Sequence, residues 1–129
     1  MTAGHDVIPI PGPSAFASLL SVAGGRDKTV VFEGFLSPKP GRRKSRLSEL
    51  MAQNAACVLY ESPFRILKLL ADISEIDSER YICIGREMTK IHEEFIRGKT
   101  SKVLDILSEK KEQLGEFSVY ISGARSVRK

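Results

Sequence analysis

The sequence contains few of the features that mark secreted, membrane-spanning or metal-binding proteins. It has two cysteines in 129 residues, and no window approaches the roughly 18 uninterrupted apolar residues of a membrane-spanning helix. The N-terminus lacks the pattern of a signal peptide. Cys57 and Cys83 each lie in a short apolar run and fit no zinc or redox spacing, so both are predicted to be buried free thiols. These absences predict a cytoplasmic protein with no metal site and no membrane partner.

The common catalytic signatures are absent as well. The sequence contains no Walker loop, no dinucleotide-binding glycine fingerprint, no CxxC pair, no HExxH and no serine-nucleophile elbow. Its apolar fraction of 42% and charged fraction of 28% are typical of a globular protein of one compact domain. Lys and Arg outnumber Asp and Glu by 20 to 16, and the resulting net charge of +4 favours an anionic partner.

Strand and helix patterns alternate along the chain. Short β-branched, aromatic or apolar runs predict strands at 29–33, 56–60, 80–86, 93–97 and 117–122. Apolar spacing and capping residues predict helices at 15–23, at 42–53, at 63–76 with Ser62 as its cap, and from a cap at Thr100 or Ser101 onward. This alternation predicts an α/β domain over residues 7–123, with a mixed sheet of about five strands and about four helices. Residues 1–6 are interpreted as a linker remnant or as residues added for expression, and residues 124–129 as a basic tail.

Two turns that lead into predicted helices are candidates for ligand contact. Pro11–Ala15 sets a glycine between two prolines, which suits close backbone approach to a ligand and equally suits a rigid corner capped by its serine. Tyr60–Arg65 follows a strand at the edge where α/β sheets bind ligands, which favours backbone contacts at Glu61 and Ser62. The alternative at the second turn is a helix cap with a surface ion pair between Glu61 and Arg65.

Two charged stretches are candidates for proton transfer and for phosphate binding. Gly85–Lys90, followed by His92, Glu93 and Glu94, groups charged side chains just beyond a buried strand, where one of them could act as a base. Lys39–Arg46 holds five cations in eight residues, and three more lie among the last five residues of the chain. Clustered cations bind phosphate backbones without reading sequence. For both stretches the alternative is a solvated charged surface.

In order along the chain, six segments are similar to motifs of the ribosomal RNA small subunit methyltransferase I family, a branch of the tetrapyrrole methylase superfamily. They are Pro9–Ala15, Phe32–Leu36, Gly41–Arg43, Tyr60–Arg65, Arg86–Lys90 with Glu93 and Glu94, and Gly115–Glu116. A single such motif has little weight, whereas six in register over residues 3–123 are specific.

The resemblance implies the second domain of a two-domain enzyme that methylates the 2′-hydroxyl of a cytidine ribose in 16S ribosomal RNA. In this superfamily S-adenosylmethionine lies between the two domains, so the resemblance also implies that this chain alone is inactive and that the parent enzyme is a homodimer. The implied cofactor contacts, largely through backbone, are Pro13, Ser14, Tyr60, Glu61, Ser62, Ile84, Gly85, Glu116 and Phe117. Glu87, Lys90 and Glu33 are implied near the methyl acceptor, and Arg42, Arg43, Lys44 and Arg65 on RNA phosphates.

Two other functions fit some of the same features. A methyltransferase domain for a corrin or porphyrin precursor would keep the fold, but the basic stretch and the Tyr60–Arg65 sequence argue against it. A non-catalytic basic RNA-binding module would keep the charge. Against this second function stands the expectation that the nine aromatic residues mostly occupy the core, which leaves no exposed platform for base stacking.

Overall fold

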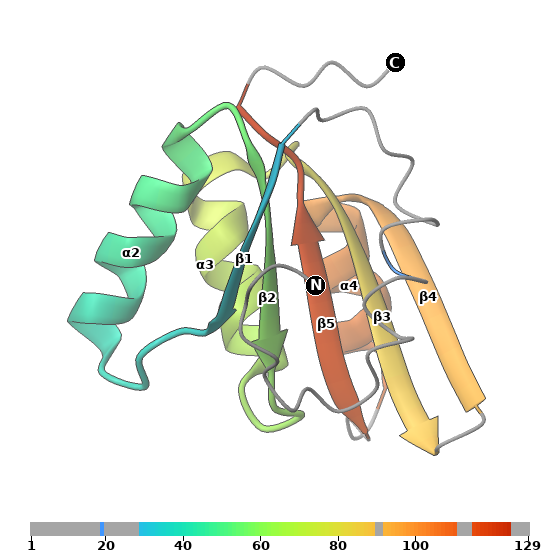
Figure 1. Ribbon diagram of the computed structural model, residues 1–129. Helices are drawn as coiled ribbons and strands as arrows, with labels where there is room; N and C mark the ends of the chain where they lie inside the picture. The colour runs from blue at the N-terminus through green and yellow to red at the C-terminus, as the bar shows by residue number, and fades with distance from the viewer. Residues whose placement is uncertain (1–18, 20–28, 90–91, 111–114, 125–129) are drawn as a thin grey trace.

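The computed structural model describes residue 19 and residues 29–89, 92–110 and 115–124, and at 87–89 and 92–93 it describes the backbone alone (Figure 1). Within these ranges the elements are β1 (Val30–Phe35), α2 (Pro40–Ala52), β2 (Ala56–Glu61), α3 (Ile66–Asp77), β3 (Tyr81–Thr89), β4 (His92–Lys99), α4 (Thr100–Ser108) and β5 (Glu116–Ile121). The predicted α/β class and five-stranded mixed sheet are confirmed, with three helices in the described part of the chain. The helix predicted at 15–23 lies outside the described residues apart from Leu19.

The five strands form one sheet in the order β1-β2-β5-β3-β4. β1 and β2 are parallel, β5 is antiparallel to both of its neighbours, and β4 is antiparallel to β3. β1, β2 and β3 therefore point the same way and end at one edge of the sheet, where β4 and β5 begin (Figure 1). We call this the carboxyl edge; its terminal strand residues are Phe35, Glu61, Thr89, His92 and Glu116.

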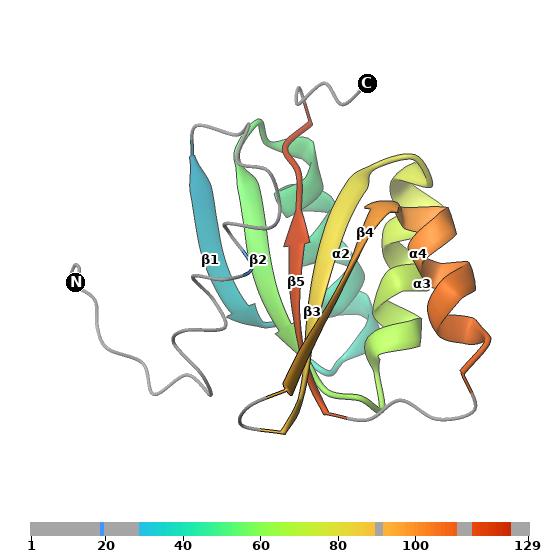
Figure 2. The same ribbon diagram turned by 90° about the vertical axis from the view of Figure 1, so that its right-hand side faces the viewer.

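The three helices all cover the same face of the sheet (Figures 1 and 2). The larger hydrophobic core lies between them and the sheet, and its members include Leu47, Leu69, Ile84, Val103 and Val119. A smaller cluster of Leu19, Ala56, Val58, Cys83 and Tyr120 packs on the opposite face. The central strands are therefore apolar on both faces, as the continuous apolar runs in the sequence require. No helix among the described residues is long and apolar enough to cross a membrane.

The third predicted helix begins later than expected, and Ser62 does not cap it. α3 starts at Ile66, has Arg65 at its N-cap position and has no side-chain cap. Residues 63–65 form a turn in which the Arg65 amide donates to the Ser62 carbonyl at 3.1 Å. Because the Ser62 amide itself donates to Glu61 Oε2 at 3.0 Å, this turn belongs to the end of β2 rather than to the helix.

The predicted end of the fourth strand at Arg97 and the predicted cap of the last helix were also wrong in detail. β4 continues through Gly98, whose φ of 144° a residue with a side chain rarely adopts, and it ends at Lys99. Neither Thr100 nor Ser101 caps α4, because Lys99 occupies the N-cap position and no side chain there makes a capping hydrogen bond. The buried Thr100 hydroxyl donates instead to the Arg80 carbonyl at 2.8 Å and so attaches the start of α4 to the residue before β3.

Candidate functional site

The register of the three central strands brings most of the implied cofactor residues together at the carboxyl edge. In one row across the sheet, Tyr60 of β2 and Gly85 of β3 both lie opposite Ser118 of β5. In the next row, Glu61 and Arg86 lie on either side of Phe117. Ser62, Ile84 and Glu116 are chain neighbours of these residues, whereas Pro13 and Ser14 lie outside the described residues. Residues of β2, β3 and β5 that are far apart in the sequence are therefore neighbours at this edge.

Glu61 is buried and fully engaged by the protein. One carboxylate oxygen pairs with Arg43 of α2, and both side chains are almost completely buried, with exposures of 4% for Glu61 and 5% for Arg43. The other oxygen accepts the hydrogen bond from the Ser62 amide. The surface ion pair between Glu61 and Arg65 is thus wrong, because Arg65 is exposed and the carboxylate faces the helix layer.

Arg86 forms a second buried cationic contact in the same row. It pairs with Glu94 of β4, and its guanidinium carbon lies 5.9 Å from the centre of the Phe117 ring, a cation–π distance. Its Nε is buried and has no hydrogen-bond partner within the described part of the chain. Arg86 and Glu61 therefore flank Phe117 from its two neighbouring strands, at the start of β5.

The other face of the edge carries aromatic rings. Tyr60 makes edge-to-face contacts with Phe32 at 5.3 Å and with Phe35 at 5.6 Å between ring centres. Burial raises the pKa of Tyr60 to about 12, so its hydroxyl is protonated at neutral pH. That hydroxyl is buried and has no hydrogen-bond partner among the residues that the structure describes. It is an available donor at the end of β2, which the sequence motif alone did not reveal.

Gly85 has its own reason to lack a side chain. A Cβ at this position would lie 3.0 Å from Cε1 of Phe95 and 3.6 Å from Cδ1 of Leu19. The Phe95 ring therefore lies directly over the backbone of β3 at the row that contains Tyr60. An alanine there would require the ring to move, because 3.0 Å is shorter than ordinary van der Waals contact.

The three residues implied near the methyl acceptor lie in different settings. Glu33 occupies a bulge in β1 beside Gly34, whose φ is 82°, and accepts two hydrogen bonds of 2.8 Å from Arg46 of α2. Both carboxylate oxygens of Glu33 are therefore engaged by Arg46. Glu87 lies opposite Glu116 at the carboxyl edge, while Lys90 lies outside the described residues.

The basic stretch divides between the two sides of α2. Arg43 is buried, so the contact with RNA phosphate that the resemblance implied for it is wrong. Spacing was the signal that could have found it, because Arg43 precedes the buried residues Leu47 and Leu50 by four and seven positions. Arg42 is exposed, as is Lys44, whose Nζ lies 3.4 Å from Glu75.

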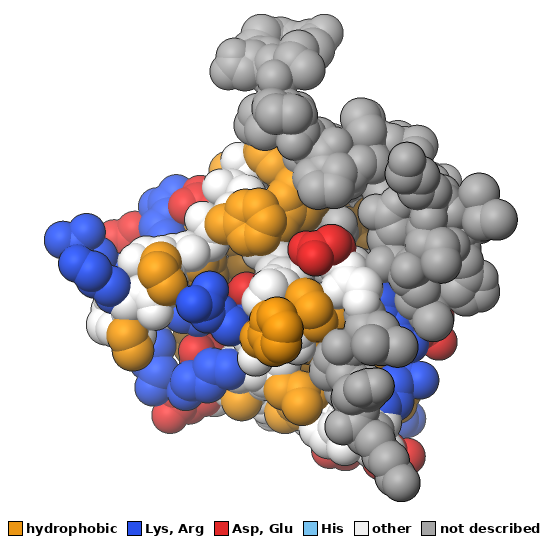
Figure 3. Space-filling view, turned by 90° about the horizontal axis from the view of Figure 1, so that it is seen from below, with side chains coloured by type: hydrophobic (Ala, Val, Ile, Leu, Met, Phe, Trp, Pro, Cys, Tyr) orange, Lys and Arg blue, Asp and Glu red, His pale blue; other side chains and the backbone are white. Residues whose placement is uncertain are grey.

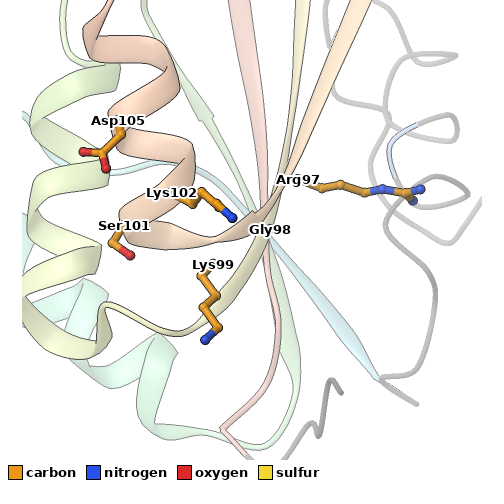
Figure 4. A pocket seen from close by; sticks show the side chains of 6 residues that line it. All are labelled: Arg97, Gly98, Lys99, Ser101, Lys102 and Asp105. Carbon is orange, nitrogen blue, oxygen red and sulfur yellow. The ribbon is translucent and has the colours of Figure 1, made fainter.

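Cys57 and Cys83 are buried free thiols as predicted, and burial raises their pKa values to about 12 and about 11. No group of three or more potential metal ligands occurs among the residues the structure describes. A surface pocket at the start of α4 includes Lys99 and Lys102, but Arg97 points to the other side of the sheet, so its cations do not converge (Figure 4).

Comparisons with known proteins identify relatives of this sequence and of this fold. No family model matches the chain. It is 44% identical over 124 residues to "Ribosomal RNA small subunit methyltransferase I" of Borrelia garinii subsp. bavariensis, and 45% identical over 120 residues to the protein of the same name from Thermotoga maritima. These matches cover 95% and 93% of this chain but 55% and 53% of the relatives. The chain thus spans about half the length of the curated relatives it matches.

Two solved structures share the fold at low sequence identity. Cobalt precorrin-4 methyltransferase CbiF and the methyltransferase CobJ each match with a TM-score of 0.58, at 12% and 17% identity. The matches cover 88% and 89% of this chain and 50% of each structure. The described domain therefore has the tetrapyrrole methylase fold, and it corresponds to half the length of each of these two structures.

Proposed function

Because this chain belongs to the ribosomal RNA small subunit methyltransferase I family over about half of its relatives' length, we propose that it is one domain of a two-domain methyltransferase. The reaction is transfer of a methyl group from S-adenosylmethionine to the 2′-hydroxyl of a cytidine ribose in 16S ribosomal RNA. The parent enzyme is a cytoplasmic homodimer, and the second wall of the cofactor site belongs to its other domain. One observation carries the proposal: the register that sets Tyr60 and Gly85 on either side of Ser118 at the carboxyl edge, with Phe117 in the next row.

The residues at this edge fit the cofactor. A nucleoside with a charged amino-acid tail needs flat apolar surface, hydrogen-bond donors and exposed backbone, and the edge offers each of these. Tyr60 supplies a buried hydroxyl that no described residue hydrogen-bonds, next to the rings of Phe32 and Phe35. The Glu61 carboxylate is already occupied by Arg43 and Ser62, so contacts at Glu61 and Ser62 come from their backbone, together with those proposed for Pro13 and Ser14.

The bound cofactor supplies a sulfonium-activated methyl group, so this chain's residues mainly align the acceptor. A base has to take the ribose proton only late in the reaction. Glu87 is the proposed group for this, with Lys90 beside the acceptor, because Glu87 lies at the carboxyl edge and Glu33 is held by Arg46. Arg42, Lys44 and Arg65 are exposed and are proposed to contact RNA phosphates, and Arg43 is removed from that set.

Calorimetry with S-adenosylmethionine tests the cofactor part of the proposal. The 129-residue chain alone should bind weakly or not at all, and the full-length gene product should bind tightly. In that product Tyr60→Phe should weaken binding, because the cofactor loses a buried hydrogen-bond donor, while Ile76→Ala on the exposed side of α3 should change nothing. Equal binding by wild type and Tyr60→Phe would remove the hydroxyl from the site.

Mass spectrometry of 16S ribosomal RNA from a deletion strain tests the reaction itself. One cytidine should lose its ribose methyl group, and the full-length gene should restore the modification. A Glu87→Gln variant should restore it poorly while binding the cofactor normally. If ribose methylation is unchanged in the deletion strain, the RNA assignment is wrong.

A further inference from the structure

Two phenylalanines at the carboxyl edge are more exposed than any other large apolar side chain that the structure describes. Phe35, the last residue of β1, is 61% exposed, and Phe64, in the turn between β2 and α3, is 95% exposed. The next most exposed are Ile76 and Ile106, at 42% each, on α3 and α4. Viewed onto this edge, apolar side chains gather at the centre of the surface (Figure 3). The expectation that the aromatic residues leave no exposed platform was therefore wrong.

Packing within the domain does not account for these rings. At 95% exposure Phe64 removes almost no apolar area from water, so it adds nothing to the core. Clustered apolar exposure on a protein surface marks an interaction site. The exposed ring of Phe35 also packs against Tyr60, and Tyr60 packs against Phe32. The position of the Phe35 ring is therefore supported by a row of aromatic side chains.

Exposed cations lie close in the chain to both rings. Arg65 follows Phe64 in the chain and is exposed. Lys39 and Arg42, at the start of α2, follow closely after Phe35 and are exposed as well. Figure 3 shows Lys and Arg side chains along the α2 side of the same surface. Aromatic rings for the bases and cations for the phosphates are the combination that proteins use to bind single-stranded nucleic acid.

We propose that Phe35 and Phe64 are stacking platforms for unpaired bases of the RNA substrate, and that they position the nucleotides next to the ribose that is methylated. The inference rests on the proposed function and adds to it the residues that recognise single-stranded RNA. Each ring holds one base by its face, while Arg65 and Arg42 neutralise the adjoining phosphates. Stacking of this kind tolerates any base, so the rings give affinity for unpaired RNA rather than for a sequence.

The test is fluorescence anisotropy with the full-length gene product and a labelled single-stranded oligoribonucleotide, compared with the same strand in a duplex. Phe64→Ala should weaken single-strand binding by roughly 5- to 150-fold, the range for loss of one stacked base. Phe64→Trp should retain wild-type affinity. Phe35→Leu keeps an apolar contact with Tyr60 and should also weaken binding, while Ile76→Ala serves as the matched control for loss of an exposed apolar side chain.

The outcomes separate this inference from the proposed function. Because Phe64 is so exposed, Phe64→Ala should unfold at the wild-type temperature, so a loss of binding cannot be assigned to misfolding. If wild type binds RNA and both Phe variants bind it equally well, the stacking role is wrong and the proposed function stands. If the variants instead change the oligomeric state with unchanged RNA affinity, the surface docks protein and the stacking role is again wrong. If wild type binds no RNA and methylates none, the proposed function itself fails.

Discussion

The cations of α2 have different roles although they are nearly consecutive in the sequence. Arg43 faces inward, is 5% exposed and pairs with Glu61 at the end of β2. Lys44 and Arg46 face outward, are 50% and 45% exposed, and pair with carboxylates at the surface. Arg42 is exposed beside them. Orientation around the helix, rather than residue type, separates a group that holds the sheet edge from groups that are available to phosphate.

The buried pair of Arg43 and Glu61 also connects α2 to the proposed cofactor site. Arg43 binds one oxygen of Glu61, whose other oxygen binds the Ser62 amide, so α2 is attached to the backbone proposed to contact the cofactor. A cation buried with its partner is costly to separate, because the remaining charge cannot be solvated. A cation at the surface loses little when its partner is removed, because water replaces it. Substitutions on the two sides of α2 should therefore differ widely in their effect.

Arg43→Ala should have the largest effect. It leaves the Glu61 carboxylate buried without its partner, and the free energy of unfolding should fall by about 3–5 kcal/mol. Urea unfolding measured by circular dichroism gives the change. A loss no larger than that of the surface variants would show that Glu61 is solvated and that the two sides of α2 do not differ.

The double variant Arg43→Met with Glu61→Gln should recover most of that loss. Both charges are removed together, and a buried ion pair contributes little net stability compared with an uncharged replacement. The glutamine oxygen can still accept the hydrogen bond from the Ser62 amide. The same urea titration should place this variant between Arg43→Ala and wild type, and equal instability of the two variants would contradict the argument.

Arg42→Ala with Lys44→Ala should leave stability almost unchanged and reduce RNA binding. Removal of each cation from an RNA phosphate should lower the slope of log affinity against log salt by about 0.7 for single-stranded RNA, so the double variant should lower it by about 1.4. Anisotropy titrations over a range of salt concentrations measure the slope. An unchanged slope would mean that the outer side of α2 is only a solvated surface, which was the alternative left open by the sequence.

Arg46→Ala should have the smallest effect. Its hydrogen bonds to Glu33 and then to Glu49 raise the pKa of the guanidinium further above its usual range, but the group is at the surface, where such pairs are screened by water. The urea midpoint should not move measurably. A loss approaching that of Arg43→Ala would show that the Glu33 bulge in β1 depends on this pair.

Local patterns predicted much of the fold but little of the site's geometry. The alternation of strands and helices, the buried thiols and the edge that carries Tyr60 and Gly85 all followed from residue patterns. Arg43 was expected on RNA phosphates and is buried, and Phe64 is exposed although the aromatic residues were expected to lie mostly in the core. Arg43 is buried because it pairs with Glu61 on β2, whereas Phe64 is 95% exposed. Both outcomes depend on the packing of elements that are distant in the sequence.

By itself, the sequence determined the type of each element, the fold class and the resemblance to a family, because propensity, apolar period and motif order are properties of the chain alone. Only the tertiary structure decided that β5 lies between β2 and β3, that Glu61 is occupied by Arg43, and that no described residue hydrogen-bonds the Tyr60 hydroxyl. Strand order and register depend on contacts between distant segments, and those contacts decide which polar groups are satisfied within the domain and which are available to a ligand.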